Sequence, residues 1–157
     1  MTRVLRDGLL AGVGVAVVGS GFAEAIRERV EALGAHTEGP VDTLVVDVSD
    51  CAEPRAALDG AWDAVQPVAT ELIAAGGGQV VLLAPRPADA RAEGTRAGLE
   101  TMARTLSIEW ARYGVRPVAI LPGAATSAAE VAELVAYLAS VAGGYYAGCA
   151  LTLGSPA

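Results

Sequence analysis

Short apolar runs alternate with helix-length segments along this chain, and the alternation restricts its fold more than any other feature. Runs such as TLVVDV and QVVLLA are apolar at most positions, which is typical of strands buried on both faces of a parallel sheet. Strands are predicted at about 13–18, 43–48, 79–84, 118–121 and 150–153, and helices at about 22–33, 54–75, 89–113 and 127–141. We therefore predict a three-layer α/β fold in one domain over residues 1–157, with a parallel sheet of about five strands and helices on both faces.

Residues with strong terminal preferences mark the helix boundaries. Pro54 suits the first turn of a helix, whereas Gly34 and the run at 76–78 suit helix ends. Ser127 is predicted to cap the last helix, and Glu130 completes a capping box with it. These signals agree with the boundaries that the apolar runs predict.

Charge and composition exclude several functional classes. The chain has 157 residues and a net charge of −7, and its eleven basic residues are all arginines scattered through the sequence. Such a chain lacks the basic field that binds nucleic acid or an anionic membrane. No stretch of about 18 strongly apolar residues is present, so we expect a cytoplasmic protein without a membrane span.

Cysteine and histidine are too scarce for a metal site or a disulfide framework. Cys51 and Cys149 are the two cysteines, and both are expected to be small, partly buried residues. His36 is the single histidine and is expected in a loop. We predict no metal ligands.

A glycine turn after the first strand has the position of a dinucleotide-binding loop. Gly19 and Gly21 follow a strand and open a helix, the context in which backbone amides bind a pyrophosphate. The full pattern has a third small residue where this chain has Glu24. Its carboxylate would lie beside the helix N-terminus and repel phosphate. We therefore predict a residual structural turn, with no cofactor bound by this chain.

Residues 94–123, GTRAGLETMARTLSIEWARYGVRPVAILPG, contain the most specific pattern. They resemble the signature region of the short-chain dehydrogenases/reductases (SDRs), where a Tyr-x-x-x-Lys pair opens a helix ending in Tyr-Gly and the next strand ends in Pro-Gly. Three further segments resemble segments of that family and follow one another in the same order: Trp62-Asp63, Leu138-Ala139-Ser140 and Tyr145-Tyr146-Ala147-Gly148. The resemblance implies a Rossmann-like sheet. It also implies a truncated one, because few residues separate Ala35 from Val41, where the family places two strands and a helix.

The positions that carry SDR chemistry hold other residues. Hydride transfer to a carbonyl needs a proton donor, a cation that keeps the donor acidic and a hydroxyl that polarises the substrate. By resemblance, Ala92 holds the tyrosine's place, Arg96 the lysine's, and Ala84 or Pro85 the serine's. The family's asparagine has no counterpart, since the chain contains no asparagine. We predict no catalytic residues and expect Arg96 to be a surface or interface residue.

Two carboxylates at the end of the second strand suggest a different chemistry. Asp47 and Asp50 could act as a phosphoacceptor site, as in receiver domains. Receivers also need a late lysine and an acidic pair after the first strand, and this chain has neither. We expect Asp47 to cap the turn that follows its strand.

The helices predicted at 54–75 and 89–113 are apolar over more of their circumference than burial against a sheet requires. Helices with such faces need a second cover, and the corresponding SDR helices pair across a two-fold axis in a four-helix bundle. We predict that this surface, together with part of the chain's tail, forms an interface. Its residues are predicted to be Ala97, Gly98, Thr101, Thr105, Ile108, Ala61, Val65, Val68, Leu72, Tyr145 and Tyr146.

These features together favour a non-catalytic SDR-like subunit. We expect it to assemble with a full-length, active SDR homologue in a heterodimer or heterotetramer, or with itself, and we expect NAD(P) on the partner. One alternative is an NAD(P)-dependent oxidoreductase that uses the Gly19–Gly21 turn and an unusual donor such as Tyr113 or Tyr145. A second is a homo-oligomeric module that binds a small ligand in the crevice near Ser49, Ala84 and Pro122.

Overall fold

Five parallel strands form one sheet in the order of the sequence. The computed structural model describes residues 5–154. The strands are β1 (Val15–Gly19), β2 (Thr43–Asp47), β3 (Gly78–Leu83), β4 (Val115–Pro122) and β5 (Ala150–Leu153), and they lie in the order β1-β2-β3-β4-β5. The helices are α1 (Ala23–Ala32), α2 (Pro54–Ala74), α3 (Ala90–Trp110) and α4 (Ala128–Ala139). The predicted fold class is therefore confirmed.

The predicted boundaries hold except at polar or proline-containing ends. β4 begins at Val115 rather than at 118, because Arg116 and Pro117 interrupt the apolar run but still pair with β3. α3 ends at Trp110, and a short 3₁₀ turn continues it to Tyr113. A second 3₁₀ turn, Val141–Tyr145, follows α4. The capping box of Ser127 with Glu130 is present as predicted.

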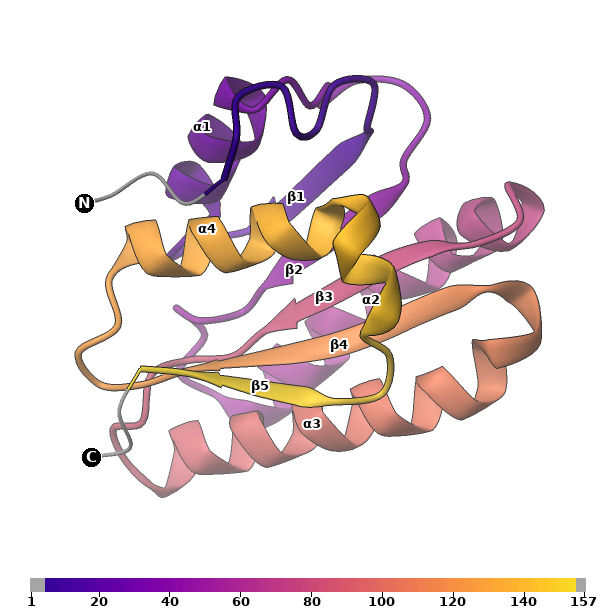
Figure 1. Ribbon diagram of the computed structural model, residues 1–157. Helices are drawn as coiled ribbons and strands as arrows, with labels where there is room; N and C mark the ends of the chain where they lie inside the picture. Colours follow the sequence, from indigo (N-terminus) through magenta and orange to yellow (C-terminus); the bar gives the residue numbers. More distant parts are fainter. Residues whose placement is uncertain (1–4, 155–157) are drawn as a thin grey trace.

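Each face of the sheet has its own apolar core. α1 and α4 cover one face, and α2 and α3 cover the other (Figure 1). Fully buried Ile26 and Val135 belong to the first core, and fully buried Val65 and Leu99 to the second. Every residue of β2 and β3 is buried, so these two strands are covered on both faces of the sheet.

The order of strands makes the placement of the helices unusual. When every strand lies beside its predecessor in the same direction, right-handed connections would put all the helices on one face. α2 and α3 follow that rule, but the connections through α1 and α4 are left-handed (Figure 1). α1 lies where a right-handed connection to a strand outside β1 would place it. The described residues have no such strand, as the resemblance to a truncated sheet implies.

Candidate functional site

A cleft of about 460 Å³ opens at the carboxyl ends of the first three strands. Gly21 borders it from the turn after β1, Ser49 and Cys51 from the loop after β2, and Pro85 and Ala92 from the region after β3. Ligands of open α/β sheets bind at this edge. Two of the predicted degenerate positions, Pro85 and Ala92, therefore do lie at the cleft.

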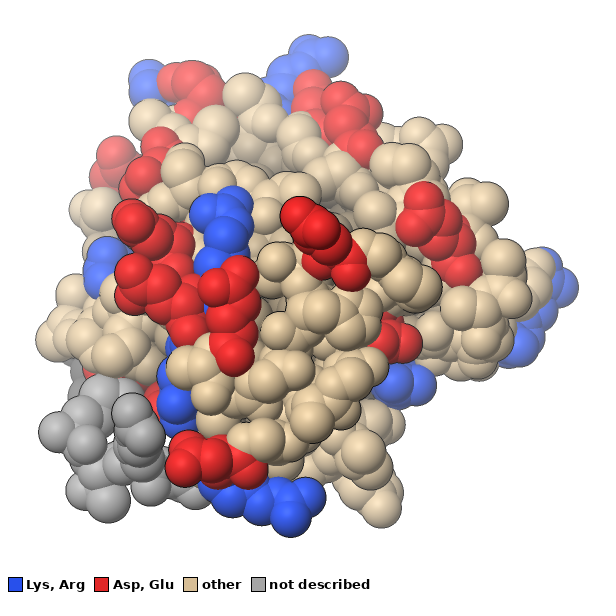
Figure 2. All heavy atoms as spheres, turned by 90° about the horizontal axis from the view of Figure 1, so that it is seen from above, with Lys and Arg blue, Asp and Glu red and all other residues tan. Residues whose placement is uncertain are grey.

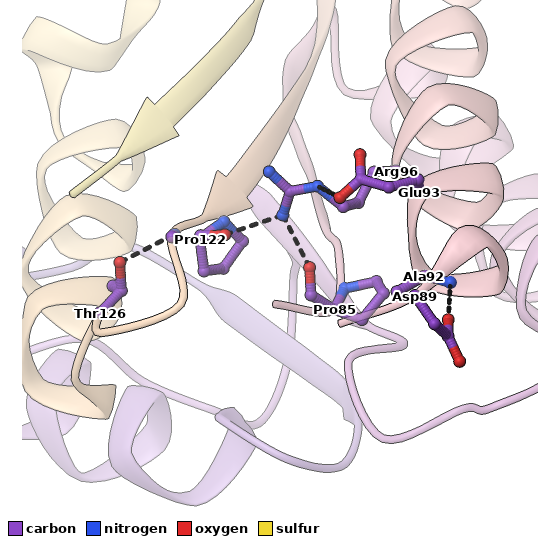
Figure 3. Close-up of polar contacts among 8 residues, drawn as sticks. Pro85, Asp89, Ala92, Glu93, Arg96, Pro122 and Thr126 are labelled. Atoms are coloured by element: carbon purple, nitrogen blue, oxygen red, sulfur yellow. Dashed lines mark hydrogen bonds and ion pairs between the residues drawn. The ribbon is translucent and has the colours of Figure 1, made fainter. Parts of the chain in front are cut away.

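The side chain of Arg96 points into the molecule and joins the ends of two strands. Its Nη1 donates hydrogen bonds to the carbonyl oxygens of Pro85, at 2.8 Å, and Pro122, at 2.7 Å (Figure 3). Its Nε lies 3.4 Å from a carboxylate oxygen of Glu93, and the Arg96 side chain is only 11% exposed. The expectation of a surface or interface residue is thus wrong. This position of α3 faces the sheet, and the carbonyl oxygens of Pro85, after β3, and Pro122, the last residue of β4, accept hydrogen bonds from the guanidinium.

The first turn of α3 carries no group that could transfer a proton at the tyrosine's place. Ala92 is half-buried, and its backbone N–H donates to Oδ1 of Asp89, the N-cap, at 2.9 Å (Figure 3). Pro85, one of the two candidates for the serine's place, is buried. Neither side chain can donate or accept a proton. These two positions therefore supply no acid or base to the cleft.

Asp47 ties the glycine turn to the end of β2. It is 2% exposed. Its Oδ2 accepts the N–H of Phe22 at 2.6 Å, and its Oδ1 accepts the N–H of Ser49 at 3.0 Å. Burial raises the pKa of this carboxyl above its ordinary value of 3.8, while the hydrogen bonds from Ser49, Phe22 and Ala23 act in the opposite direction. The predicted cap of the following turn is present, and the bond from Phe22 is a further contact.

The two glycines of the turn allow close packing against β2. Gly19 and Gly21 have φ angles of +98° and +105°, in the region that favours glycine. A Cβ at Gly19 would collide with the Asp47 carbonyl, and one at Gly21 would collide with the Ser49 hydroxyl. The Asp47 carboxylate already accepts an amide beside the start of α1, where a phosphate would bind. This geometry agrees with the prediction of a structural turn.

Two arginines on the cleft walls were not singled out from the sequence. Nε and Nη2 of Arg86 donate to the Thr126 carbonyl at 3.0 and 2.6 Å, and its guanidinium lies 4.5 Å from the centre of the Phe22 ring. Arg91 forms an ion pair with Glu53. The position of Arg86 soon after a buried strand was the available signal, because such positions lie at the ligand-binding edge.

The residues of the predicted interface separate into an outer and an inner group. Ala97, Thr101, Thr105 and Ile108 are exposed on α3, and Ile108 is 78% exposed. Ala61, Val65 and Leu72 are fully buried beneath α2, so their side chains are not available to another chain. Val68 is half-buried.

Gly98 has an internal role that the sequence did not reveal. A Cβ there would lie 2.6 Å from Cδ1 of Leu58, so its lack of a side chain lets α3 approach α2. In the tail, Tyr145 is 92% exposed. Tyr146 is half-buried, and its ring packs edge-on against that of Tyr137 at 5.9 Å between centroids.

The other expectations concern metals, membranes and the scarce residues. Within residues 5–154, no group of three or more histidine, cysteine or acidic residues could hold a metal ion. No helix in the same range is long and apolar enough to cross a membrane. Cys51 and Cys149 are free and partly buried. His36 lies in the connection after α1, where it forms one bridge with Gly14.

Replacing Arg96 by methionine should destabilise the fold. Arg96→Met leaves two strand-end carbonyls without their charged donor, so we expect the free energy of unfolding to fall by about 2–3 kcal/mol. Arg104→Met is the matched control, because Arg104 is exposed and its ion pair with Glu100 should contribute at most about 0.5 kcal/mol. Urea denaturation of both variants measures the difference. Equal losses would show that Arg96 does not hold the strand ends.

Replacing Asp47 by asparagine should weaken the turn and change its pH dependence. Both carboxylate oxygens accept an N–H, and an amide can accept only on one side, so we expect Asp47→Asn to cost about 1–3 kcal/mol at pH 7. Because the folded-state pKa is raised, the contribution of Asp47 is complete below its unfolded pKa and is lost as pH rises through the folded pKa. The advantage of the wild type should therefore grow as the pH falls toward 3.8. Urea denaturation of both proteins at several pH values checks this, and a constant difference would contradict it.

Comparison with solved structures identifies the architecture. Gluconate 5-dehydrogenase from Burkholderia cenocepacia J2315, in complex with NADP and tartrate, is 19% identical with a TM-score of 0.76, covering 94% of this chain and 96% of that one. A protein from Burkholderia xenovorans described as a short-chain dehydrogenase/reductase is 18% identical, with the same TM-score of 0.76 and coverages of 94% and 96%. Ribose-5-phosphate isomerase from Brucella melitensis 16M is 17% identical, with a TM-score of 0.82 and coverages of 96% and 94%.

These identities establish a shared fold and leave the reaction open, since an isomerase is among the similar structures. No protein-family model and no curated protein sequence matches the chain. By its structure, the chain is therefore similar to the short-chain dehydrogenases/reductases, and it has their Rossmann-like α/β fold.

Proposed function

We propose that this chain is a non-catalytic SDR-like subunit that assembles with an active SDR homologue and stabilises or regulates it. The observation that carries the proposal is Ala92, a residue without acid or base chemistry, at the cleft and in the tyrosine's place. The cation beside it, Arg96, is bonded to the Pro85 and Pro122 carbonyls. A proton donor and its activating cation are two of the groups that carbonyl reduction needs from the protein.

The outer face of α3 supports assembly. Ala97, Thr101 and Thr105 recur every four residues and are exposed, so they form a stripe of small side chains along the helix. Ile108, also exposed, extends this stripe toward the end of α3. Small side chains let another helix approach closely, and an exposed isoleucine gains by being covered.

The charges of α2 favour a different chain over a second copy. The helix carries one basic residue, Arg55, against Asp59, Asp63 and Glu71, and all four are exposed. Arg55 pairs with Asp59. A two-fold contact between identical α2 helices would double the remaining negative charge at one interface. We therefore infer a partner with basic residues opposite Asp63 and Glu71, and NAD(P) bound by that partner.

Charged substitutions on the outer stripe should weaken assembly strongly and leave the fold intact. Ala97→Arg and Thr101→Arg place a cation on the exposed surface that we assign to the interface, and we expect at least about tenfold weaker association. Gly98 is unsuitable for this test because it packs on Leu58. Ala129→Arg, on the exposed side of α4, is the matched control.

The assembly is measured by native mass spectrometry of the complex isolated from its own cells, with circular dichroism to check folding. A fixed stoichiometry with a longer dehydrogenase subunit, lost in the two α3 variants and kept in the control, supports the proposal. A homo-oligomer without such a subunit, or unchanged assembly of the folded variants, contradicts it.

The cleft favours a second candidate, a small-ligand-binding module. Its 460 Å³ volume and the guanidinium of Arg86 at its wall suit a small anionic molecule. Titration with NADH and NADPH, followed by cofactor fluorescence, tests the third possibility, an NAD(P)-dependent oxidoreductase. We expect no binding at millimolar cofactor, because the Asp47 carboxylate and Glu24 lie at the start of α1. Saturable binding would favour the oxidoreductase alternative.

A further inference from the structure

The outer edge of β1 is an incomplete strand pairing. β1 pairs with β2 alone within the described residues. The N–H of Thr43 donates to the Gly14 carbonyl, and the N–H of Ser20 donates to the Asp47 carbonyl. The backbone N–H and C=O groups therefore point toward β2 at every second residue, namely at Gly14, Ala16, Val18 and Ser20. The alternate residues Val15, Val17 and Gly19 therefore direct their N–H and C=O groups outward.

A further parallel strand pairing begins at this edge and ends after a single bridge. Val15 donates its N–H to the His36 carbonyl at 2.9 Å, and His36 donates to the Val13 carbonyl at 3.0 Å. This single parallel bridge is not continued, because the connection turns away toward Pro40 and β2. The N–H of Val17 and both backbone groups of Gly19 have no protein partner within residues 5–154.

One side chain protects part of the open edge. Nη2 of Arg27 donates to the Val17 carbonyl at 2.9 Å. A charged side chain over an edge strand is a common protection against unwanted pairing. A long side chain can move away more easily than a paired strand can. An incoming strand could therefore displace Arg27 from the Val17 carbonyl.

The surface beside this edge is acidic. Glu24, Glu28 and Glu31 lie on α1 next to β1 and are exposed, and Glu38 is exposed in the connection that follows. The two basic residues of α1 are engaged, Arg27 by the Val17 carbonyl and Arg29 by Glu133 at 2.7 Å. Figure 2 looks onto this end of the molecule and shows acidic side chains spread across the face, with basic side chains among and around them.

We propose that β1 accepts an extended, basic peptide segment of a partner protein as an added strand. The segment lies outside Val17 and Gly19, displaces Arg27 from the Val17 carbonyl and places lysine or arginine side chains near the glutamates of α1. Main-chain bonds give such an added strand its affinity, and the flanking charges give it specificity. α1 lies on the face that a connection to a strand outside β1 would use, and within the described residues no strand occupies that position.

Two synthetic peptides of alternating sequence test this surface. One alternates lysine with valine and the other glutamate with valine, so both favour extended structure and differ only in charge. Each is titrated into the full chain while amide hydrogen exchange is followed by NMR. The lysine peptide is expected to protect the amides of Val17 and Gly19, which point outward. Ala16 and Val18, already bonded to β2, serve as internal controls.

Three variants complete the experiment. Val17→Pro removes the outward N–H at a position where an edge strand tolerates proline, and it should weaken peptide binding about tenfold, the equivalent of one lost hydrogen bond. Arg27→Ala exposes the Val17 carbonyl and should strengthen binding several-fold. The double variant Glu24→Gln, Glu28→Gln removes charge without touching the strand and should weaken binding, so the test does not depend on the proline variant folding.

Two results would overturn the proposal. One is absence of protection at Val17 and Gly19 with the lysine peptide at millimolar concentration. The other is equal binding of the glutamate peptide. Because α2 and α3 lie on the opposite face from α1, either result leaves the proposed assembly through α3 untouched.

Discussion

The guanidinium of Arg96 is a buried charge held between the ends of β3 and β4. A buried charge is costly unless hydrogen bonds satisfy it, and here the carbonyls of Pro85 and Pro122 do so at 2.8 and 2.7 Å. The two strands, the start of α3 and the wall of the cleft are thereby fixed to one another. Asp47 acts likewise on the neighbouring strand, where its carboxylate joins the turn after β1 to the end of β2. The edge of the sheet at the carboxyl ends of its strands therefore depends on two largely buried ionisable side chains.

The sheet was predictable from local sequence, whereas the direction of Arg96 was not. Apolar runs and terminal residues are local, so all five strands and the capping box at Ser127 followed from the sequence. Ser49, Ala84 and Pro122, at the ends of three strands, were also expected to lie at one edge of the sheet. Whether an arginine at the start of α3 faces solvent or the sheet depends on the rotation of that helix and on carbonyls brought together by β3–β4 pairing. No pattern of residue types contains that information.

Neighbouring small residues on α3 illustrate the same limit. Ala97 and Gly98 are consecutive, and composition alone places both on an apolar face. Successive helical residues point about 100° apart, so only one of them can face outward. Ala97 is exposed, whereas Gly98 forms the close contact with Leu58 of α2. The exposed stripe of small side chains on α3 is therefore narrower than the sequence suggests.

The left-handed connection through α1 shows that core packing outweighs the usual hand of a crossover. α1 packs on α4 around a shared apolar core, and Arg29 pairs with Glu133 between them. Moving α1 to the other face would expose that core. The chain instead returns to β2 around the start of β1, where Gly14 makes the passage possible. A Cβ on Gly14 would collide with the Pro40 carbonyl and lie 2.8 Å from the His36 ring. This detour takes the connection away from the outer edge after one bridge, and so the detour itself leaves Val17 and Gly19 without backbone partners.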